Sequence, residues 1–239
     1  MIKLNNISHS YGNKFILQNL SLNFEANKLT CLLGDSGCGK TTILRLIAGL
    51  ETPTSGEIII EDKTVTANGK VIVPPYKRNI GFIFQDLALW PHFTVYKNIA
   101  FGLTEQKQYD EKKIKNTVLN MLEFFGLQKH ADKYPHQLSG GQKQLIAISR
   151  SLVLKPKILL MDEPLANLDV KLKRKILEHI KELKKNFDLT IIYVTHDHKE
   201  AFTIADKVVV MDEGEIKDAG TVEEIKNSDN EFVKYFLEY

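Results

Sequence analysis

Cysteine is scarce in this chain of 239 residues, and no apolar run approaches the roughly 18 residues that a membrane-spanning helix needs. Cys31 and Cys38 do not form a C-x-x-C pair, which argues against a disulfide framework or a zinc site. We therefore expect both thiols to be reduced. The start, MIKLNNISHS, has no apolar core of the kind found in signal peptides. The sequence predicts a protein that neither crosses a membrane nor is exported.

An excess of charge of one sign is also missing. The 32 lysines and arginines stand against 30 aspartates and glutamates, and a net charge of +2 is too small for a dedicated nucleic-acid-binding protein. We expect no nucleic-acid partner. Seven prolines, 14 glycines and a hydrophobic fraction of 43% exclude collagen-like and disordered chains. At about 150 residues per domain, the length allows one large domain or one and a half.

Short apolar runs that predict strands alternate with helical patterns. The predicted strands fall at 16–24, 28–33, 56–60, 79–84 and 158–161, with one more near the start and two after residue 188. The runs at 29–33 and 158–161 do not alternate with polar residues, which is typical of strands covered on both faces of a parallel sheet. Between Asp86 and Arg150 the apolar spacing becomes helical. The sequence therefore predicts an α/β chain with a parallel sheet and a helical insertion.

The segment GDSGCGKT at residues 34–41 fits G-x-x-x-x-G-K-[ST] between a predicted strand and a predicted helix. Glycines let the backbone wrap round a polyphosphate, so that N–H groups and the helix N-terminus face the anion. Lys40 can reach the β and γ phosphates, and the Thr41 hydroxyl can bind Mg²⁺. The plainer alternative is a glycine-rich turn with a solvated lysine.

Two carboxylates follow the apolar run that ends at Met161. The carboxyl ends of parallel strands are where ligands bind. If the extended geometry persists, Asp162 and Glu163 point to opposite sides, so that one serves Mg²⁺ and the other faces the attacking water as a general base. An exposed acidic turn before Pro164 is the alternative.

LSGGQ at residues 138–142 would alone be an ordinary helix start. Together with GDSGCGKT and ILLMDEP, in this order and spacing, it resembles the nucleotide-binding subunits of ABC transporters over essentially the whole chain. The resemblance implies a P-loop NTPase fold: one ABC ATPase domain over 1–239, with a core of 1–85 and 151–239 that carries an N-terminal antiparallel β subdomain, and an α-helical subdomain over 86–150.

The resemblance also implies further site residues and the cofactors ATP and Mg²⁺. Tyr11 matches the aromatic residue that stacks on adenine, and Asp169 the acidic residue that communicates across a dimer. Gln85 matches the glutamine at Mg²⁺ or the attacking water, and His196 the histidine at the γ-phosphate. The implied catalytic residues are Glu163, His196, Gln85 and Lys40, and the implied metal ligands are Thr41, Gln85 and Asp162. The implied nucleotide-binding residues are Tyr11, Gly34, Asp35, Ser36, Gly37, Cys38, Gly39, Lys40, Thr41, Thr42, Ser139, Gly140, Gly141 and Gln142.

In this family two subunits pack head to tail, so the expected partner is a second copy of the chain. Ser139 and the backbone of Gly140 and Gly141 would face the γ-phosphate held by Lys40 of the other copy. ATP would then join the halves, and hydrolysis would weaken their interface.

The apolar segment 86–103 resembles the part by which importer ATPases hold a short helix of their membrane subunit. We therefore expect a transmembrane permease to dock near Gln85 to Phe101, although Phe93, Val95 and Ile99 would equally suit packing within the chain. YPHQLSG before the signature also favours an importer, with an extracytoplasmic solute-binding protein in the complex and a peripheral position on the cytoplasmic face of the membrane. The pattern is similar to ATPases for ferric iron, sugars, polyamines or sulfate, without their C-terminal regulatory domain.

Three residues depart from the family pattern: Leu145 where arginine is common, Ala166 for a frequent serine, and His198 where glutamine is usual. We expect them to affect turnover rather than the reaction. The alternatives are a soluble ABC ATPase with a non-transport role and an inactive regulatory subunit. Six lysines between 171 and 185 predict a solvated helix face, with acidic lipid as the alternative ligand.

Overall fold

The computed structural model describes residues 1–166 and 168–238; Asn167, within the ANLD segment, and Tyr239 lie outside this part. It contains two sheets. The first is antiparallel throughout, in the order β2 (Lys14–Phe24), β1 (Ile2–Tyr11), β4 (Ser55–Ile60), β5 (Lys63–Ala67) and β6 (Lys70–Val71). Asn68 and Gly69, both with positive φ, form the tight β5–β6 turn, as is typical of an Asn-Gly pair between two strands.

The second sheet forms the centre of the molecule. Its order is β11 (Glu215–Gly220), β10 (Lys207–Asp212), β3 (Leu29–Leu33), β9 (Thr190–Thr195), β8 (Ile158–Asp162) and β7 (Ile80–Ile83). All neighbours pair in parallel except β10 and β11. The α/β class, with a mostly parallel core sheet and an antiparallel N-terminal sheet, is confirmed.

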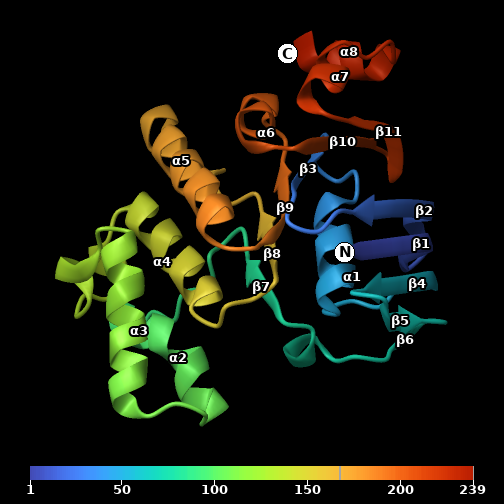
Figure 1. The fold of residues 1–239 in the computed structure, drawn as a ribbon. Coiled ribbons are helices and arrows are strands. Elements are labelled where there is room, and N and C mark those ends of the chain that lie inside the picture. The colour runs from blue at the N-terminus through green and yellow to red at the C-terminus, as the bar shows by residue number, and fades with distance from the viewer. Residues whose placement is uncertain (167, 239) are drawn as a thin grey trace.

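Helices cover the sheets and form a group to one side (Figure 1). Their bounds are α1 (Lys40–Ala48), α2 (Val95–Gln106), α3 (Glu111–Phe124), α4 (Gly140–Leu152), α5 (Val170–Asn186), α6 (His198–Ile204), α7 (Val222–Lys226) and α8 (Glu231–Glu238). Short 3₁₀ turns lie at Pro75–Lys77, Gln128–His130 and Pro135–Gln137. In Figure 1 the helices α2, α3 and α4 lie together, away from α1 and the antiparallel sheet.

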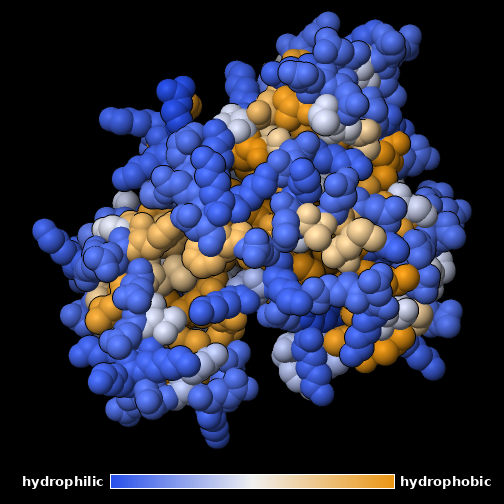
Figure 2. All heavy atoms as spheres, viewed as in Figure 1, coloured by the Kyte–Doolittle hydropathy of each residue, from blue (hydrophilic) through white to orange (hydrophobic). Residues whose placement is uncertain are grey.

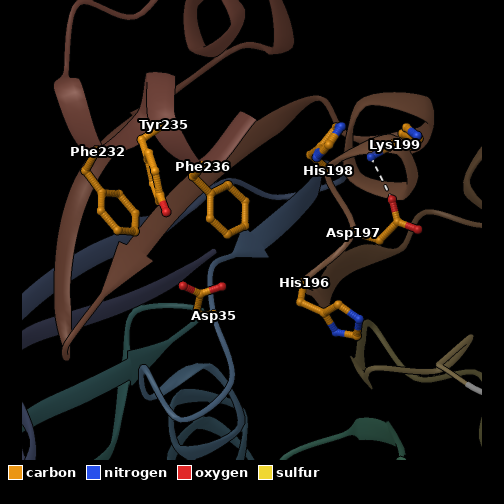
Figure 3. Close-up of a pocket in the computed structure, with 8 residues that line it drawn as sticks. All are labelled: Asp35, His196, Asp197, His198, Lys199, Phe232, Tyr235 and Phe236. Atoms are coloured by element: carbon orange, nitrogen blue, oxygen red, sulfur yellow. Dashed lines mark hydrogen bonds between the residues drawn. The ribbon is translucent and has the colours of Figure 1, made fainter. Parts of the chain in front are cut away.

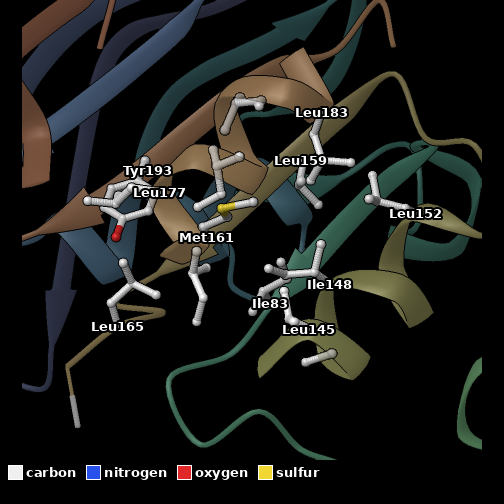
Figure 4. Close-up of a cluster of buried hydrophobic side chains, with 14 of the residues drawn as sticks. Ile83, Leu145, Ile148, Leu152, Leu159, Met161, Leu165, Leu177, Leu183 and Tyr193 are labelled. Atoms are coloured by element: carbon white, nitrogen blue, oxygen red, sulfur yellow. The ribbon is translucent and has the colours of Figure 1, made fainter. Parts of the chain in front are cut away.

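The central sheet is buried on both faces, as its continuous apolar strands predict. Leu159 and Met161 of β8 join one apolar cluster, whereas Ile158 and Leu160 join the other. The first cluster packs the sheet against α4 and α5 (Figure 4). Successive strand residues point to opposite faces, so a strand between two clusters must be apolar at every position.

The lysine-rich helix differs from its prediction at two positions. α5 buries Ile176, Ile180 and Leu183 and ends before Phe187, which is extended. The side chains of Lys173 and Lys184 are only 20% and 27% exposed, and they form ion pairs with Glu200 and Asp206, respectively. The spacing of lysines along a helix does not show which of them meet carboxylates on the next element.

On the face shown in Figure 2 the surface is mostly hydrophilic, with apolar side chains gathered in separate patches. Among residues 1–166 and 168–238, no helix combines the length and apolar character needed to cross a bilayer.

The buried Arg78 joins the phosphate-loop helix to the antiparallel sheet. It is 5% exposed, and its guanidinium donates to the carbonyls of Leu46 and Ile47 at the C-terminus of α1. It also donates to Val65 and Val73 carbonyls and the Thr66 hydroxyl. Burial lowers the pKa of Arg78 to about 10, so it remains charged at neutral pH. A cation at a helix C-terminus also meets the negative end of the helix dipole.

Replacing Arg78 with methionine should lower the free energy of unfolding by about 2–4 kcal/mol, because buried carbonyls lose their donors. Urea unfolding followed by circular dichroism measures this loss. Lys63→Met, on an exposed position of β5, is the matched control and should change stability by less than about 0.5 kcal/mol. Equal urea midpoints for the two variants would contradict a role of Arg78 in holding α1 against the antiparallel sheet.

Candidate functional site

Three neighbouring parallel strands end at one edge of the central sheet. Leu33, the last residue of β3, pairs with Thr195 of β9, and Val194 of β9 pairs with Asp162 of β8. The phosphate loop follows Leu33, the acidic pair closes β8, and His196 follows Thr195. The parallel register thus brings together three segments that lie far apart in the sequence, at the edge where open α/β sheets bind ligands.

The phosphate loop is shaped by close backbone approaches. A Cβ on Gly34 would lie 2.1 Å from the Met211 carbonyl oxygen, and one on Gly39, where φ is +103°, would lie 2.8 Å from the Leu17 side chain. The Gly214 amide donates to the Cys38 carbonyl at 3.1 Å. Only glycine fits such positions, so β2 and the β10–β11 turn enclose the loop.

Lys40 lies inside this loop rather than in solvent, which excludes the solvated-lysine alternative. It is 3% exposed, and its Nζ donates to the carbonyls of Gly34 at 2.8 Å and Asp35 at 2.7 Å. The Cys38 sulfur lies 3.6 Å from Nζ. Burial raises the pKa of the Cys38 thiol, although Lys40 acts in the opposite direction. Cys31 is buried elsewhere and both thiols are free.

Thr41 and Asp162 are hydrogen-bonded and together offer oxygen atoms that could bind a metal ion. Thr41 Oγ1 donates to Asp162 Oδ1 at 2.7 Å. Burial raises the pKa of Asp162, and the bond from Thr41 opposes this. A hydroxyl and a carboxylate fit Mg²⁺, which takes few protein ligands when phosphates supply the rest. Within the described residues no three His, Cys, Asp or Glu side chains group as a metal cage.

Glu163 does not continue the extended strand, contrary to the geometry assumed in the sequence analysis. Its φ is +41°, although it precedes a proline, and its amide donates to the Val194 carbonyl. The side chain turns toward His196, whose Nδ1 lies 3.2 Å from Glu163 Oε2. Asp162 is 4% exposed and the Glu163 side chain 15%, so the acidic pair does not form an exposed turn.

A cavity of about 340 Å³ opens beside the loop. It is lined by Tyr11, Ile16, Ser36, Gly37, Gly39, Lys40, Thr41, Thr42, Gln85 and Glu163. Tyr11 is half exposed here and donates to Glu51 Oε2 at 2.5 Å, a partner that sequence reasoning did not find. Gln85 is exposed in the loop after β7. Within the loop, Gly34 and Cys38 are buried and do not line this cavity.

A second cavity of about 500 Å³ lies on the other side of His196. Figure 3 shows the rings of Phe232, Tyr235 and Phe236 from α8 pointing toward Asp35. His196 also lines this cavity. Asp35 therefore faces this cavity rather than the one lined by Thr41. His198, one of the three residues that depart from the family pattern, also lines this cavity. Its ring lies near that of Phe202.

The signature residues lie apart from the phosphate loop. Ser139 caps α4 by accepting from the Gln142 amide, and Gln142 Oε1 accepts from the Ser139 amide. A Cβ on Gly141 would lie 2.6 Å from Leu172 of α5, so α4 begins against α5. None of residues 139–142 lines the cavity at the loop. One copy of the described chain therefore does not bring the two motifs together.

The other two departures have structural surroundings. Leu145 is buried in the core cluster between α4 and the sheet. Ala166 is exposed, and its amide donates to the Glu163 carbonyl at 3.3 Å. Asp169 is exposed and caps α5 by accepting from the Leu172 amide at 3.0 Å. Neither Leu145 nor Ala166 touches the cavity beside Lys40.

Comparison with known proteins identifies the family of the chain. The sequence model of the family described as "ABC transporter" matches residues 17–166, more than half of the chain. The chain belongs to the ABC transporter family. Among solved structures, the ATP-binding cassette MJ0796 in a dimeric post-hydrolysis state with ADP and Pi has a TM-score of 0.82 at 31% identity, covering 93% of this chain and 99% of that one. The chain is thus an ABC ATPase cassette that binds ATP.

Curated relatives are import ATP-binding proteins. The spermidine/putrescine import ATP-binding protein PotA of Clostridium novyi is 45% identical over 99% of this chain and 67% of its own length. The Fe(3+) ions import ATP-binding protein FbpC of Vibrio cholerae is 45% identical over 94% of this chain and 62% of its own. The chain spans about two thirds of the length of these ABC relatives, or slightly less.

In this ABC cassette, Gly39→Ala should raise the dissociation constant for ATP about 10- to 100-fold, because the new Cβ meets Leu17 and φ is unfavourable. Binding of a fluorescent ATP analogue measures this change. Gly126→Ala, at φ +67° with open space around its Cβ, controls for backbone strain alone and should bind as the parent does. Parent-like binding by Gly39→Ala would show that the loop tolerates the side chain.

Proposed function

We propose that the chain is the ATP-hydrolysing subunit of an ABC importer, working as a homodimer beneath a separate membrane subunit. The observation that supports this most is the meeting of Lys40, Asp162 and His196 at one sheet edge, with the LSGGQ segment left outside. A site built this way needs a second copy to complete it.

In the proposed mechanism the chain positions ATP and stabilises charge. The loop amides and Lys40 bind the phosphates, and Lys40 exchanges its carbonyl partners for them. Thr41, Asp162 and Gln85 would hold Mg²⁺, which neutralises phosphate charge when bound. Glu163 accepts the proton of the attacking water, and His196 donates toward the γ-phosphate. Tyr11 stacks on the adenine from the open side of the cavity.

The homodimer is head to tail, with Ser139 and the amides of Gly140 and Gly141 facing the phosphates bound to the other copy. Two observations support this. These residues begin a helix, where free amides favour an anion, and the similar cassette MJ0796 is dimeric. The exposed Asp169 would then lie at the interface between the copies.

A groove of about 810 Å³ is the proposed docking site of the permease. Trp90 forms part of its wall: Arg150 lies over the indole ring at 5.0 Å and donates to the Ala88 carbonyl, and Asn98 accepts from the Trp90 amide. Val95 and Ile99 are fully buried, so these two serve packing within the chain. Within Gln85 to Phe101, Ala88 and Trp90 line this groove, which Tyr76 also lines.

Import, rather than export, is supported by the relatives, which are named as import proteins for spermidine/putrescine and for Fe(3+) ions. We propose a peripheral place on the cytoplasmic face of the membrane, with a solute-binding protein outside. In this proposal those other subunits select the solute.

Glu163→Gln should bind ATP with parent-like affinity and hydrolyse it about 10²- to 10⁴-fold more slowly, because an amide cannot accept the proton of water. Phosphate release and light scattering measure turnover and ATP-dependent dimerisation. Glu123→Gln, exposed on α3, should behave as the parent. Hydrolysis by Glu163→Gln at the parent rate would exclude Glu163 as the base.

Tyr76→Asp should abolish recovery of the membrane subunit while leaving ATP hydrolysis by the isolated chain intact. Tyr76 is 82% exposed on the groove, so the change places a charge in the docking surface without disturbing the core. Affinity isolation from gently solubilised native membranes, with mass spectrometry, identifies what binds. Leu119→Asp, exposed on α3, is the control.

A multi-span protein recovered with the parent and with Leu119→Asp, but not with Tyr76→Asp, supports the importer. Recovery of the parent only from the soluble fraction with a soluble partner would favour the alternative, a soluble ABC ATPase.

A further inference from the structure

A buried carboxylate lies directly behind His196. Glu200 of α6 is 5% exposed, and its two oxygens accept from three side chains on two other elements, β9 and α5. Glu200 Oε2 accepts from the Tyr193 hydroxyl at 2.8 Å and the Thr195 hydroxyl at 2.9 Å, and Oε1 accepts from Lys173 Nζ at 2.6 Å. Burial, followed by the charge of Glu200, raises the pKa of Tyr193 well above its usual value, which keeps this phenol a donor.

The hydrogen-bond network of Glu200 and Lys173 includes the residues on both sides of His196. Thr195 precedes the histidine, and its hydroxyl accepts from the amide of Asp197, which follows it, at 3.0 Å. Asp197 Oδ2 accepts from Lys173 at 3.4 Å, and Oδ1 accepts from the Lys199 amide (Figure 3). His196 is therefore the exposed tip of a turn whose two flanks are tied to Glu200 and Lys173.

Lys173 connects this turn to the interface segment. It lies on α5, one turn after Asp169, and its amide donates to the Asp169 carbonyl at 2.9 Å. Figure 1 shows α5 beside α6, and Lys173 is the cation that bridges them. A shift of the Asp169 segment along the axis of α5 would move the ammonium that Glu200 and Asp197 both bind. An unpaired carboxylate is costly at a buried site, so the turn that carries His196 should move together with the Lys173 ammonium.

We propose that Glu200 and Lys173 are positioning residues that fix His196 against Glu163 and make its position depend on Asp169. This inference rests on the proposed function, because it assigns His196 a part in hydrolysis. The pair does not touch the phosphate-loop cavity. Its loss should therefore reduce kcat and leave ATP affinity unchanged, whereas general damage to the fold would reduce both.

The test uses Glu200→Gln, Lys173→Met and Lys173→Arg in the full chain, with kcat, the dissociation constant for ATP and the unfolding temperature measured for each. We expect kcat to fall about 10- to 100-fold in the first two, since small displacements of a catalytic group have effects of this size. ATP affinity should stay within about twofold of the parent, and Lys173→Arg should recover much of kcat because it keeps the charge.

Lys184→Met is the matched control. Lys184 lies on the same helix and forms the same kind of ion pair, with Asp206, but it contacts neither flank of His196. A fall of kcat in Lys184→Met equal to that in Lys173→Met would overturn the proposal, since the loss would then follow from any weakened ion pair of α5. If Glu200→Gln does not fold, the Lys173 variants decide.

A double-mutant cycle separates positioning from an independent effect. If Glu200 acts through His196, adding Glu200→Gln to His196→Ala should lower kcat no further. Multiplied losses, or parent-like kcat in Glu200→Gln and Lys173→Met, would overturn the proposal. A parent chain that binds ATP without hydrolysing it would instead contradict the proposed function, so the two failures are distinguishable.

Discussion

Because β9 pairs in parallel with β3 on one side and β8 on the other, three loops that carry polar groups leave the sheet at the same edge. The phosphate loop, the turn at Glu163 and the turn at His196 owe their proximity to this pairing. The apolar clusters on both faces hold the strands in register, since a shift of one residue would exchange the faces. The chemistry of the site depends on a core that contains none of its catalytic groups.

Sequence reasoning predicts the parts of this structure that are encoded locally. The continuous apolar runs identify β3 and β8, and GDSGCGKT identifies the loop between β3 and α1, because glycine spacing and strand composition are properties of a few neighbouring residues. In the site, the order of the motifs along a parallel sheet is enough to bring Lys40, Asp162 and His196 to one edge.

Features that depend on distant partners are not predicted. Arg78, Lys173 and Glu200 are single charged residues outside any motif, and their contacts lie 5 to 32 residues away or on other elements. The positive φ of Glu163 is likewise unexpected before a proline, because the carbonyl that accepts from the Glu163 amide belongs to Val194 on the neighbouring strand. Whether a lysine on α5 is solvated or paired is decided by carboxylates of α6 and of the turn between α6 and β10, not by helical spacing.

The hydrogen bonds from Lys40 to carbonyl groups of the phosphate loop affect which ligands the loop selects. Its ammonium is already out of water and already donates to two carbonyls, so binding substitutes one set of acceptors for another and buries no new charge. A neutral ligand offers the ammonium nothing better than the carbonyls it would give up. A polyphosphate offers charged oxygens, whose hydrogen bonds are roughly twice as strong. The loop therefore discriminates against uncharged compounds that share the shape of a nucleoside, and does so before any side chain reads the base.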